Sequence, residues 1–121
     1  MASWKTEDDL WGFLVKRLRG KWYRSEMSCP DGFPDSFGLW HGQVIFLEHK
    51  IGRPSTVSFS HAQLHFAHDC ERHSVPWWCC FGHRGRVRFF SSPRLDHETE
   101  PPFWIPPEEV LHGIAIRRAS P

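Results

Sequence analysis

The sequence feature that most constrains the fold is a pair of β-rich runs on either side of His41-Gly42. Gly takes a positive φ freely, and His is among the residues that sometimes do. The pattern therefore predicts a β-hairpin with a two-residue turn, in which Trp40 faces Gln43.

This register has a chemical consequence at the open end of the hairpin. Counting back from the turn, Asp35 faces Glu48, and facing residues share one side of a sheet with Cβ atoms roughly 4.5–5.5 Å apart. Lys50 lies two residues beyond Glu48 and points to the same side. Two facing carboxylates suit Mg²⁺ or Mn²⁺, and a nearby Lys can offset charge building on a phosphate.

The remaining pattern predicts a mixed α/β sheet flanked by helices, in the order α-β-β-β-α-β-β. Thr6 and the acids after it open a helix that Gly20 ends, and Ser60-x-x-Gln63 opens a second one. The expected elements are a helix over about 6–19, a strand over 21–26, the hairpin, a helix over about 60–72, and strands over 75–81 and 86–90. Residues 91–107 are expected to be irregular, with a helical turn or two at 108–112.

Composition limits the class of protein. The chain has 121 residues, the size of one domain, and 15 Lys and Arg against 14 Asp and Glu give a net charge of +1. A polycationic nucleic-acid coat is excluded, but a local basic patch is not. No run approaches the ~20 apolar residues of a membrane span, and the N-terminus lacks a signal-peptide core. We therefore expect a cytoplasmic protein with no membrane partner and reduced cysteines, unless the cysteines bind metal.

Four pieces of the sequence occur together in a known superfamily. They are a helix that carries Glu7, the step Gly32-Phe33-Pro34-Asp35, the Glu48-His49-Lys50 end of the hairpin, and the Ser60-x-x-Gln63 helix start. In this order they resemble the PD-(D/E)xK nucleases, and in finer detail the compact stand-alone VRR-NUC type of phages and bacteria. The resemblance covers about residues 5–90 of a single nuclease domain spanning 1–121. Residues 91–121 form an extension of unknown role.

The resemblance implies a role for each matched residue. Asp35 and Glu48 would hold Mg²⁺ or Mn²⁺ together with the backbone carbonyl of His49, whose side chain points to the opposite face. Glu7 would reach the metal directly or through water. Lys50 would be the catalytic lysine, and Gln63 would position the water, the lysine or the DNA. His49 departs from the aliphatic residue that is frequent at this position in the family.

The implied activity is metal-dependent hydrolysis of DNA phosphodiester bonds by an endonuclease, selective for branched DNA such as four-way junctions. The resemblance to these stand-alone enzymes also implies a homodimer that works in a bacterial or phage-infected cell. The apolar residues that could form a dimer interface are Trp4, Trp11, Phe103, Trp104 and Ile105.

Arginines alternate late in the sequence. Arg84, Arg86 and Arg88 are expected to share one face of a strand, either as a solvated face or as a stripe of phosphate contacts. Further candidates for DNA contact are Lys16, Arg17, Arg19, Lys21 and Arg53, and Trp40 could stack on a splayed base.

Plainer explanations exist for each site residue. Glu7 could favour the helix dipole, Gln63 could complete a capping box, and Glu48 and Lys50 could be an exposed ion pair. Asp35 could be a turn residue. These explanations do not predict that Asp35 and Glu48 should face each other.

Two other functional classes remain open. One is a catalytically idle nucleic-acid-binding module of the same fold. The other is a small zinc-stabilised interaction domain built on Cys70-x-x-His73 and Cys79-Cys80-x-x-His83. Adjacent residues of a strand point to opposite faces, so only one of Cys79 and Cys80 could join such a site.

Overall fold

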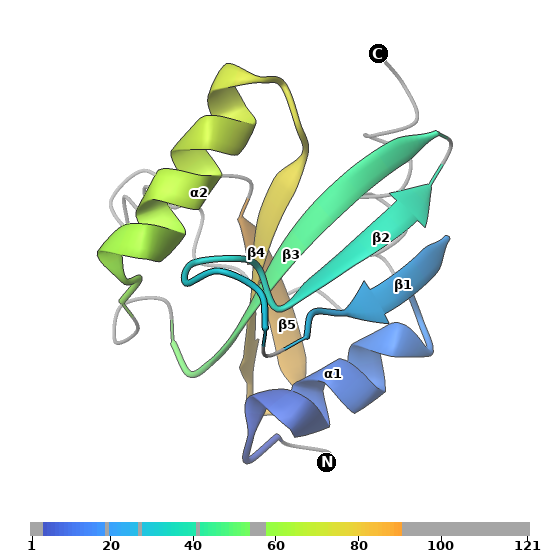
Figure 1. The fold of residues 1–121 in the computed structure, drawn as a ribbon. Helices are drawn as coiled ribbons and strands as arrows, with labels where there is room; N and C mark the ends of the chain where they lie inside the picture. Colours follow the sequence, from blue (N-terminus) through green and yellow to red (C-terminus); the bar gives the residue numbers. More distant parts are fainter. Residues whose placement is uncertain (1–3, 19, 27, 41, 54–57, 91–121) are drawn as a thin grey trace.

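The structure is a computed structural model, described here for residues 4–18, 20–26, 28–40, 42–53 and 58–90. It has two helices and five strands in the predicted order (Figure 1). Their bounds are α1 Glu7–Val15, β1 Lys21–Arg24, β2 Ser36–Trp40, β3 Gln43–Ile51, α2 His61–Arg72, β4 Trp77–His83 and β5 Arg86–Phe90.

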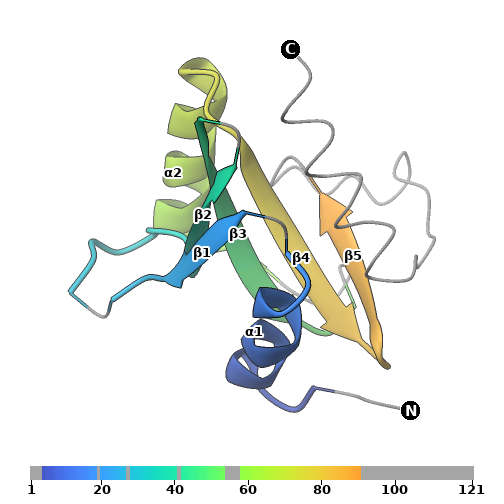
Figure 2. The same cartoon turned by 90° about the vertical axis from the view of Figure 1, so that its right-hand side faces the viewer.

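The five strands form one mixed sheet in the order β1-β2-β3-β4-β5. β3 and β4 run parallel, with α2 as the crossover between them, and the other neighbouring pairs are antiparallel. The helices cover opposite faces of the sheet, as Figure 2 shows. The expected mixed sheet flanked by helices is therefore present. No helix among the described residues is long and apolar enough to cross a membrane.

The predicted hairpin register is confirmed. Trp40 pairs with Gln43, and the ladder continues without a slip to Ser36 paired with Leu47. Gly42 has a φ of +75°, as a tight turn requires. His41 lies outside the described residues.

Both helices begin with capping boxes, of which the sequence indicated the one at Ser60 and only the capping side chain at Thr6. The side chain of Thr6 accepts from the Asp9 N–H, and the Asp9 carboxylate accepts from the Thr6 N–H. Ser60 and Gln63 make the same reciprocal pair at the start of α2. The first helix is shorter than predicted. α1 ends at Val15, and the chain turns back through Gly20, with a φ of +87°, to start β1.

The strand predicted over 75–81 lies two residues later, as β4. Pro76 has no N–H to donate, and its carbonyl accepts from the Phe46 N–H just before the ladder begins. At the other end, β4 extends to His83, which pairs with Arg86 across a two-residue turn.

The core consists of two clusters, one on each face of the sheet. The cluster under α1 contains Leu10, Leu14, Ile45, Leu47, Trp78, Cys80 and Val87, and the cluster under α2 contains Ala67, Cys70, Trp77, Cys79, Phe81 and Phe90. The first cluster also takes in Trp4, whose ring packs edge-on against Phe13. Our expectation that Trp4 supplies a dimer interface is wrong, because Trp4 is only 9% exposed.

Candidate active site

The alternation of side chains along β3 divides three consecutive residues between the two faces. Ile45 and Leu47 belong to the cluster under α1, so Glu48 and Lys50 point to the α2 face. His49 points the other way, as expected, and is buried against Trp11 of α1, with ring centroids 5.4 Å apart. Trp11 is itself partly exposed, so its expected role as interface material stays a prediction.

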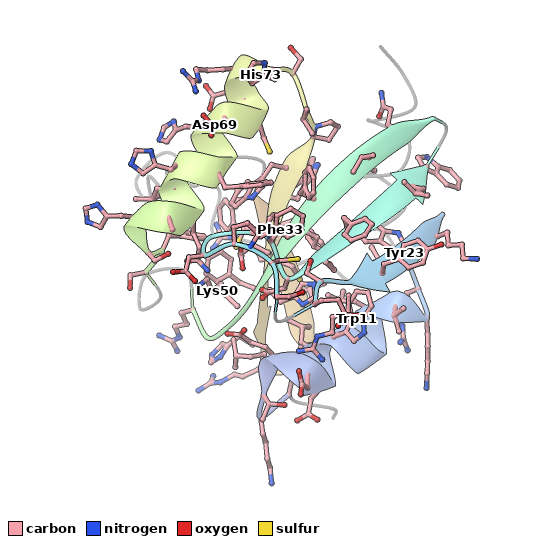
Figure 3. The ribbon with its side chains drawn as sticks, in the orientation of Figure 1. Trp11, Tyr23, Phe33, Lys50, Asp69 and His73 are labelled. Atoms are coloured by element: carbon pink, nitrogen blue, oxygen red, sulfur yellow. The ribbon has the colours of Figure 1, made fainter. Side chains whose placement is uncertain are left out.

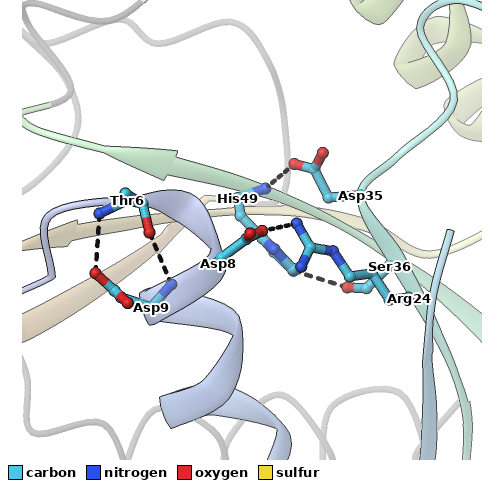
Figure 4. A network of polar contacts seen from close by, with 7 residues as sticks. All are labelled: Thr6, Asp8, Asp9, Arg24, Asp35, Ser36 and His49. Atoms are coloured by element: carbon cyan, nitrogen blue, oxygen red, sulfur yellow. Dashed lines mark hydrogen bonds and ion pairs between the residues drawn. The ribbon is translucent and has the colours of Figure 1, made fainter. Parts of the chain in front are cut away.

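The buried His49 ring is tied to the hairpin by Ser36. The hydroxyl of Ser36 lies 2.8 Å from His49 Nε2, as Figure 4 shows. Burial, the largest effect, lowers the pKa of His49 to about 4, so the ring is neutral near pH 7. Ser36 and His49 hold the two strands in register directly behind the acidic residues.

Asp35 comes immediately before β2 and is held from both neighbouring strands. Its Oδ2 accepts a 2.8 Å hydrogen bond from the His49 N–H (Figure 4), and its carbonyl accepts from the Ser25 N–H. In an extended strand the N–H and C=O of one residue point to the same side. The His49 carbonyl is therefore expected to point toward the Asp35 side of β3.

The Glu48 carboxyl group is the most perturbed group of the site. Glu48 is 2% exposed, and its Oε1 accepts from Gln63 Nε2 at 3.3 Å. Burial raises the pKa of Glu48 to about 9, helped by the hydrogen-bonded contact with Asp35 and the charge on it. When both acids are ionised, Oε2 of Glu48 has no hydrogen-bond donor among the described residues. A shared proton or a cation would supply the missing partner.

Gln63 joins the helix cap to the site. Its Oε1 accepts from the Ser60 N–H at 2.9 Å and from Lys50 Nζ at 3.2 Å. With the amide oxygen so engaged, the amide nitrogen faces Glu48. The capping role and the site role of Gln63, which the sequence left as alternatives, are therefore both present.

Lys50 has a second neighbour that the sequence did not reveal. Its ammonium lies 5.1 Å from the centroid of the Phe59 ring, a cation–π distance. Figure 3 shows Lys50 at the N-terminal end of α2, the end opposite His73. Phe59 directly precedes the Ser60 cap, so its place near β3 depends on how α2 docks and has no signal in the local pattern.

Glu7 lies in the first turn of α1, and its carboxyl group belongs to the same electrostatic cluster. Partial burial and the charge on Asp35 raise the pKa of Glu7, whereas Lys50 and Arg24 lower it. The residue as a whole remains exposed. Among the described residues, no group of three or more His, Cys, Asp or Glu side chains is arranged to hold a metal ion. The site thus offers one close pair of carboxylates with Glu7 nearby, which suits a cation that keeps several waters.

The loop before Asp35 is docked onto α2 by Gly32 and Phe33. Gly32 has a φ of +85°, and a Cβ there would lie 2.4 Å from the backbone of Ala62. The Phe33 ring packs edge-on against Phe46 and Phe66. The Gly-Phe-Pro part of the sequence motif therefore has a structural role, since it fixes the approach of Asp35 to the start of α2.

Two of the candidate arginines share the face of the acidic pair. Lys50 pairs with Phe81, and Phe81 pairs with Arg88, so their side chains point to one side of the sheet. Arg86 lies two residues from Arg88 and points the same way. Arg88 also lies over the Phe90 ring at 4.9 Å.

The other basic candidates differ in position. Arg84 lies in the turn between β4 and β5, with a φ of 51°, and therefore does not extend the strand face of Arg86 and Arg88 as expected. Both residues of this two-residue turn, Arg84 and Gly85, have positive φ, as a type I′ turn requires, and this removes Arg84 from the strand. Arg84 and Arg53 both lie close enough to His83 to lower its pKa, after burial as the larger cause.

Lys16 caps the C-terminal end of α1, about 13 Å along the helix axis from Glu7. Lys16 therefore lies at the end of α1 that is farther from the acidic pair. Arg17 packs on the Phe13 ring of the same helix. Arg19 lies outside the described residues, as do Phe103, Trp104 and Ile105.

The three cysteines of the zinc alternative, Cys70, Cys79 and Cys80, behave as buried apolar residues. Cys79 belongs to the cluster under α2 and Cys80 to the cluster under α1, so they point to opposite faces as expected. Burial raises the pKa of Cys70 to about 11 and raises those of Cys79 and Cys80 well above their ordinary value, which disfavours the thiolates that zinc requires. The described residues thus give no support to the zinc alternative.

The class of fold follows from the sheet order, the parallel β3–β4 step and the acid-bearing hairpin. It is the PD-(D/E)xK restriction-endonuclease-like fold that the sequence predicts. A similar solved structure is that of Hjc from Archaeoglobus fulgidus, described as a Holliday junction resolvase from an archaeal hyperthermophile. The match has a TM-score of 0.61 and 18% identity, and covers 90% of this chain and 97% of the other. No protein-family profile and no curated protein sequence matches the chain.

Proposed function

We propose that this protein is a metal-dependent endonuclease that hydrolyses DNA phosphodiester bonds. The observation that carries the proposal is the buried Glu48 carboxyl group, which has an unpartnered oxygen beside Asp35 and lies on the same face as Lys50. An apolar residue would serve a purely structural role better, because burying a carboxylate without a partner is costly. The similarity to a structure named as a Holliday junction resolvase supports branched DNA, such as a four-way junction, as the substrate.

Asp35 and Glu48 would hold Mg²⁺ or Mn²⁺, with the His49 carbonyl as a further ligand and Glu7 acting through water. The residues fit such a cation, since the unpartnered oxygen of Glu48 has no hydrogen-bond donor among the described residues and hard oxygen ligands suit these ions. A bound divalent ion would polarise the phosphate and lower the pKa of water.

Lys50 and Gln63 act as a fixed pair beside this position. The ammonium of Lys50 is held by the Gln63 oxygen and the Phe59 ring, so it is oriented before substrate arrives. It offsets the negative charge that builds on the phosphate in the transition state. The Gln63 amide keeps Glu48 and Lys50 in a fixed relation through its two ends.

The DNA would follow the face that carries Lys50. Arg86 and Arg88 lie on this face, and Arg53 and Arg84 lie near His83 at the end of β4. These cations would contact phosphates and set the position of the strand. We further propose that the protein is of VRR-NUC type, works in the cytoplasm and acts as a homodimer, which would place one site on each of two strands.

The test is cleavage of linear, nicked and four-way-junction DNA in Mg²⁺ or Mn²⁺. The wild-type protein is expected to cut the junction, and Lys50→Ala and Asp35→Ala are expected to slow cutting by about 10²-fold or more. Arg72→Ala is the matched control, because it removes a cation at the far end of α2. An idle module would bind DNA and cut none of the three substrates. Undiminished cutting by both site variants would remove the proposed site.

A further inference from the structure

Exposed apolar side chains gather on one part of the sheet that α2 leaves uncovered. Tyr23 is 41% exposed, Leu39 46% and Val44 40%. The register pairs Leu39 with Val44 and Tyr23 with Phe37, and Phe37 pairs with Phe46, which packs against α2. All these side chains therefore lie on the same face of the sheet as Glu48 and Lys50.

Within this surface two aromatic rings are stacked. The Tyr23 and Phe37 rings have centroids 5.5 Å apart and planes inclined by 24°. The ammonium of Lys21 lies 5.9 Å from the Tyr23 centroid. We call Tyr23 and Phe37 the aromatic platform. Figure 3 shows Tyr23 on β1, at the sheet edge away from α2.

The aromatic platform is continuous with the candidate active site. Phe37 follows Asp35 by two residues, so their Cα atoms are at most about 7 Å apart. Asp35 contacts Glu48 and Phe37 pairs with Phe46, so both side chains lie on the same face of the sheet. The Ser25 N–H donates to the Asp35 carbonyl, so the hydrogen bonding between the β1 and β2 segments extends as far as Asp35. A chain that passes the Asp35 carboxylate would therefore reach the rings within the length of about one nucleotide.

We propose that the aromatic platform stacks an unpaired base of the DNA strand whose phosphate enters the Asp35–Glu48 site. This inference rests on the proposed function and adds the kind of DNA that the site selects. Base stacking on an exposed ring needs no particular sequence, because every base has a π-face. A base can leave the stack at a gap or a branch point. In a continuous duplex every base is paired and stacked between its neighbours, so none is available to the platform.

The alternative occupant of this surface is a second copy of the chain. Leu39 and Val44 would add apolar area to such an interface. Two observations favour DNA: the cation over Tyr23 suits a polyanion, and the rings lie beside the candidate active site. A two-fold interface uses the same patch on both copies, so it would bring two Lys21 ammonium groups of like charge together without any gain in binding energy.

The experiment measures binding of the full-length protein by fluorescence anisotropy, with Ca²⁺ present to neutralise the acidic residues. The probes are a fully paired duplex and the same duplex with a short single-stranded gap. Tyr23→Leu keeps the apolar area and removes the ring, so it is expected to weaken binding to gapped DNA by about tenfold and binding to duplex by less than twofold. Tyr23→Phe is expected to bind both DNAs like wild type. Leu39→Ala is the control on the same surface and is expected to leave the gap preference intact.

Three results would overturn the inference in distinguishable ways. Equal binding of gapped DNA by wild type and Tyr23→Leu would remove the platform and leave the nuclease proposal standing. A shift from dimer to monomer in Tyr23→Leu and Leu39→Ala by sedimentation velocity, with equal loss on both DNAs, would assign the surface to a second copy. Failure of the wild-type protein to bind either DNA would remove the proposed function together with the platform.

Discussion

Glu48→Gln is expected to remove the loss of stability that the metal-free protein undergoes as the pH rises. Glu48 keeps its proton in the folded state up to a pKa of about 9, whereas the unfolded chain loses it near the ordinary value of 4.5. Between these two values the unfolded state binds fewer protons, so the free energy of unfolding falls as the pH rises. Gln cannot ionise and keeps nearly the same shape.

The size of the effect follows from the width of the window. Each pH unit inside the window is worth about 1.4 kcal/mol, so wild type loses up to ~4 kcal/mol from about pH 5 to about pH 8. The His49 pKa, lowered by burial to about 4, acts in the opposite direction, but it is common to both proteins and cancels in their difference. A loss of this size is a large part of the stability of a small domain.

The assay is denaturant unfolding of wild type and Glu48→Gln in EDTA at several pH values. Glu48→Gln should gain on wild type steadily as the pH rises. Added Mg²⁺ or Mn²⁺ should restore wild type at high pH, because a cation replaces the missing partner of the ionised carboxylate, and should do less for Glu48→Gln. Parallel stability curves for the two proteins in EDTA would refute the reasoning.

Two further substitutions test the support of the site. Gly32→Ala should destabilise the protein by ~2 kcal/mol or more, since its φ is +85° and a Cβ would lie 2.4 Å from the Ala62 backbone. The control Gly12→Ala meets nothing within 4 Å and should stabilise by about 0.5–1 kcal/mol in the same thermal denaturation series. Ser36→Ala should cost about 1–3 kcal/mol in urea unfolding because it leaves the His49 ring buried without its partner. Equal midpoints for Gly32→Ala and Gly12→Ala, or a neutral Ser36→Ala, would contradict these accounts of the two positions.

Local rules predicted the hairpin and the shared face of its charged residues correctly. The two-residue turn and the period of two along a strand are backbone properties, so the register from Trp40 back to Ser36 followed from the position of Gly42. The same alternation put Glu48 and Lys50 on one face and His49 on the other. The capping box of α2 was equally legible, because it needs only Ser60 and Gln63 three residues apart.

Packing between distant segments decided what the local pattern left open. Trp4 was expected at an interface, but it is buried in the cluster under α1, where burial of its ring stabilises the fold. Arg84 does not share the strand face of Arg86 and Arg88, because it occupies a position of positive φ in the β4–β5 turn. The part of the sheet that α2 covers decides which aromatic side chains remain exposed. The exposure of Tyr23 therefore became known only from the structure.

The sequence by itself determined the facing acids and the lysine beside them, because hairpin geometry acts over a few residues. Only the tertiary structure determined that α2 covers this face, with the Gln63 amide between Glu48 and Lys50 and the Phe59 ring beside the ammonium. It also brought Glu7, from the helix on the opposite face, into the same field of charge. The physical reason is that these contacts join segments far apart in the chain, and their geometry is set by how the two core clusters pack.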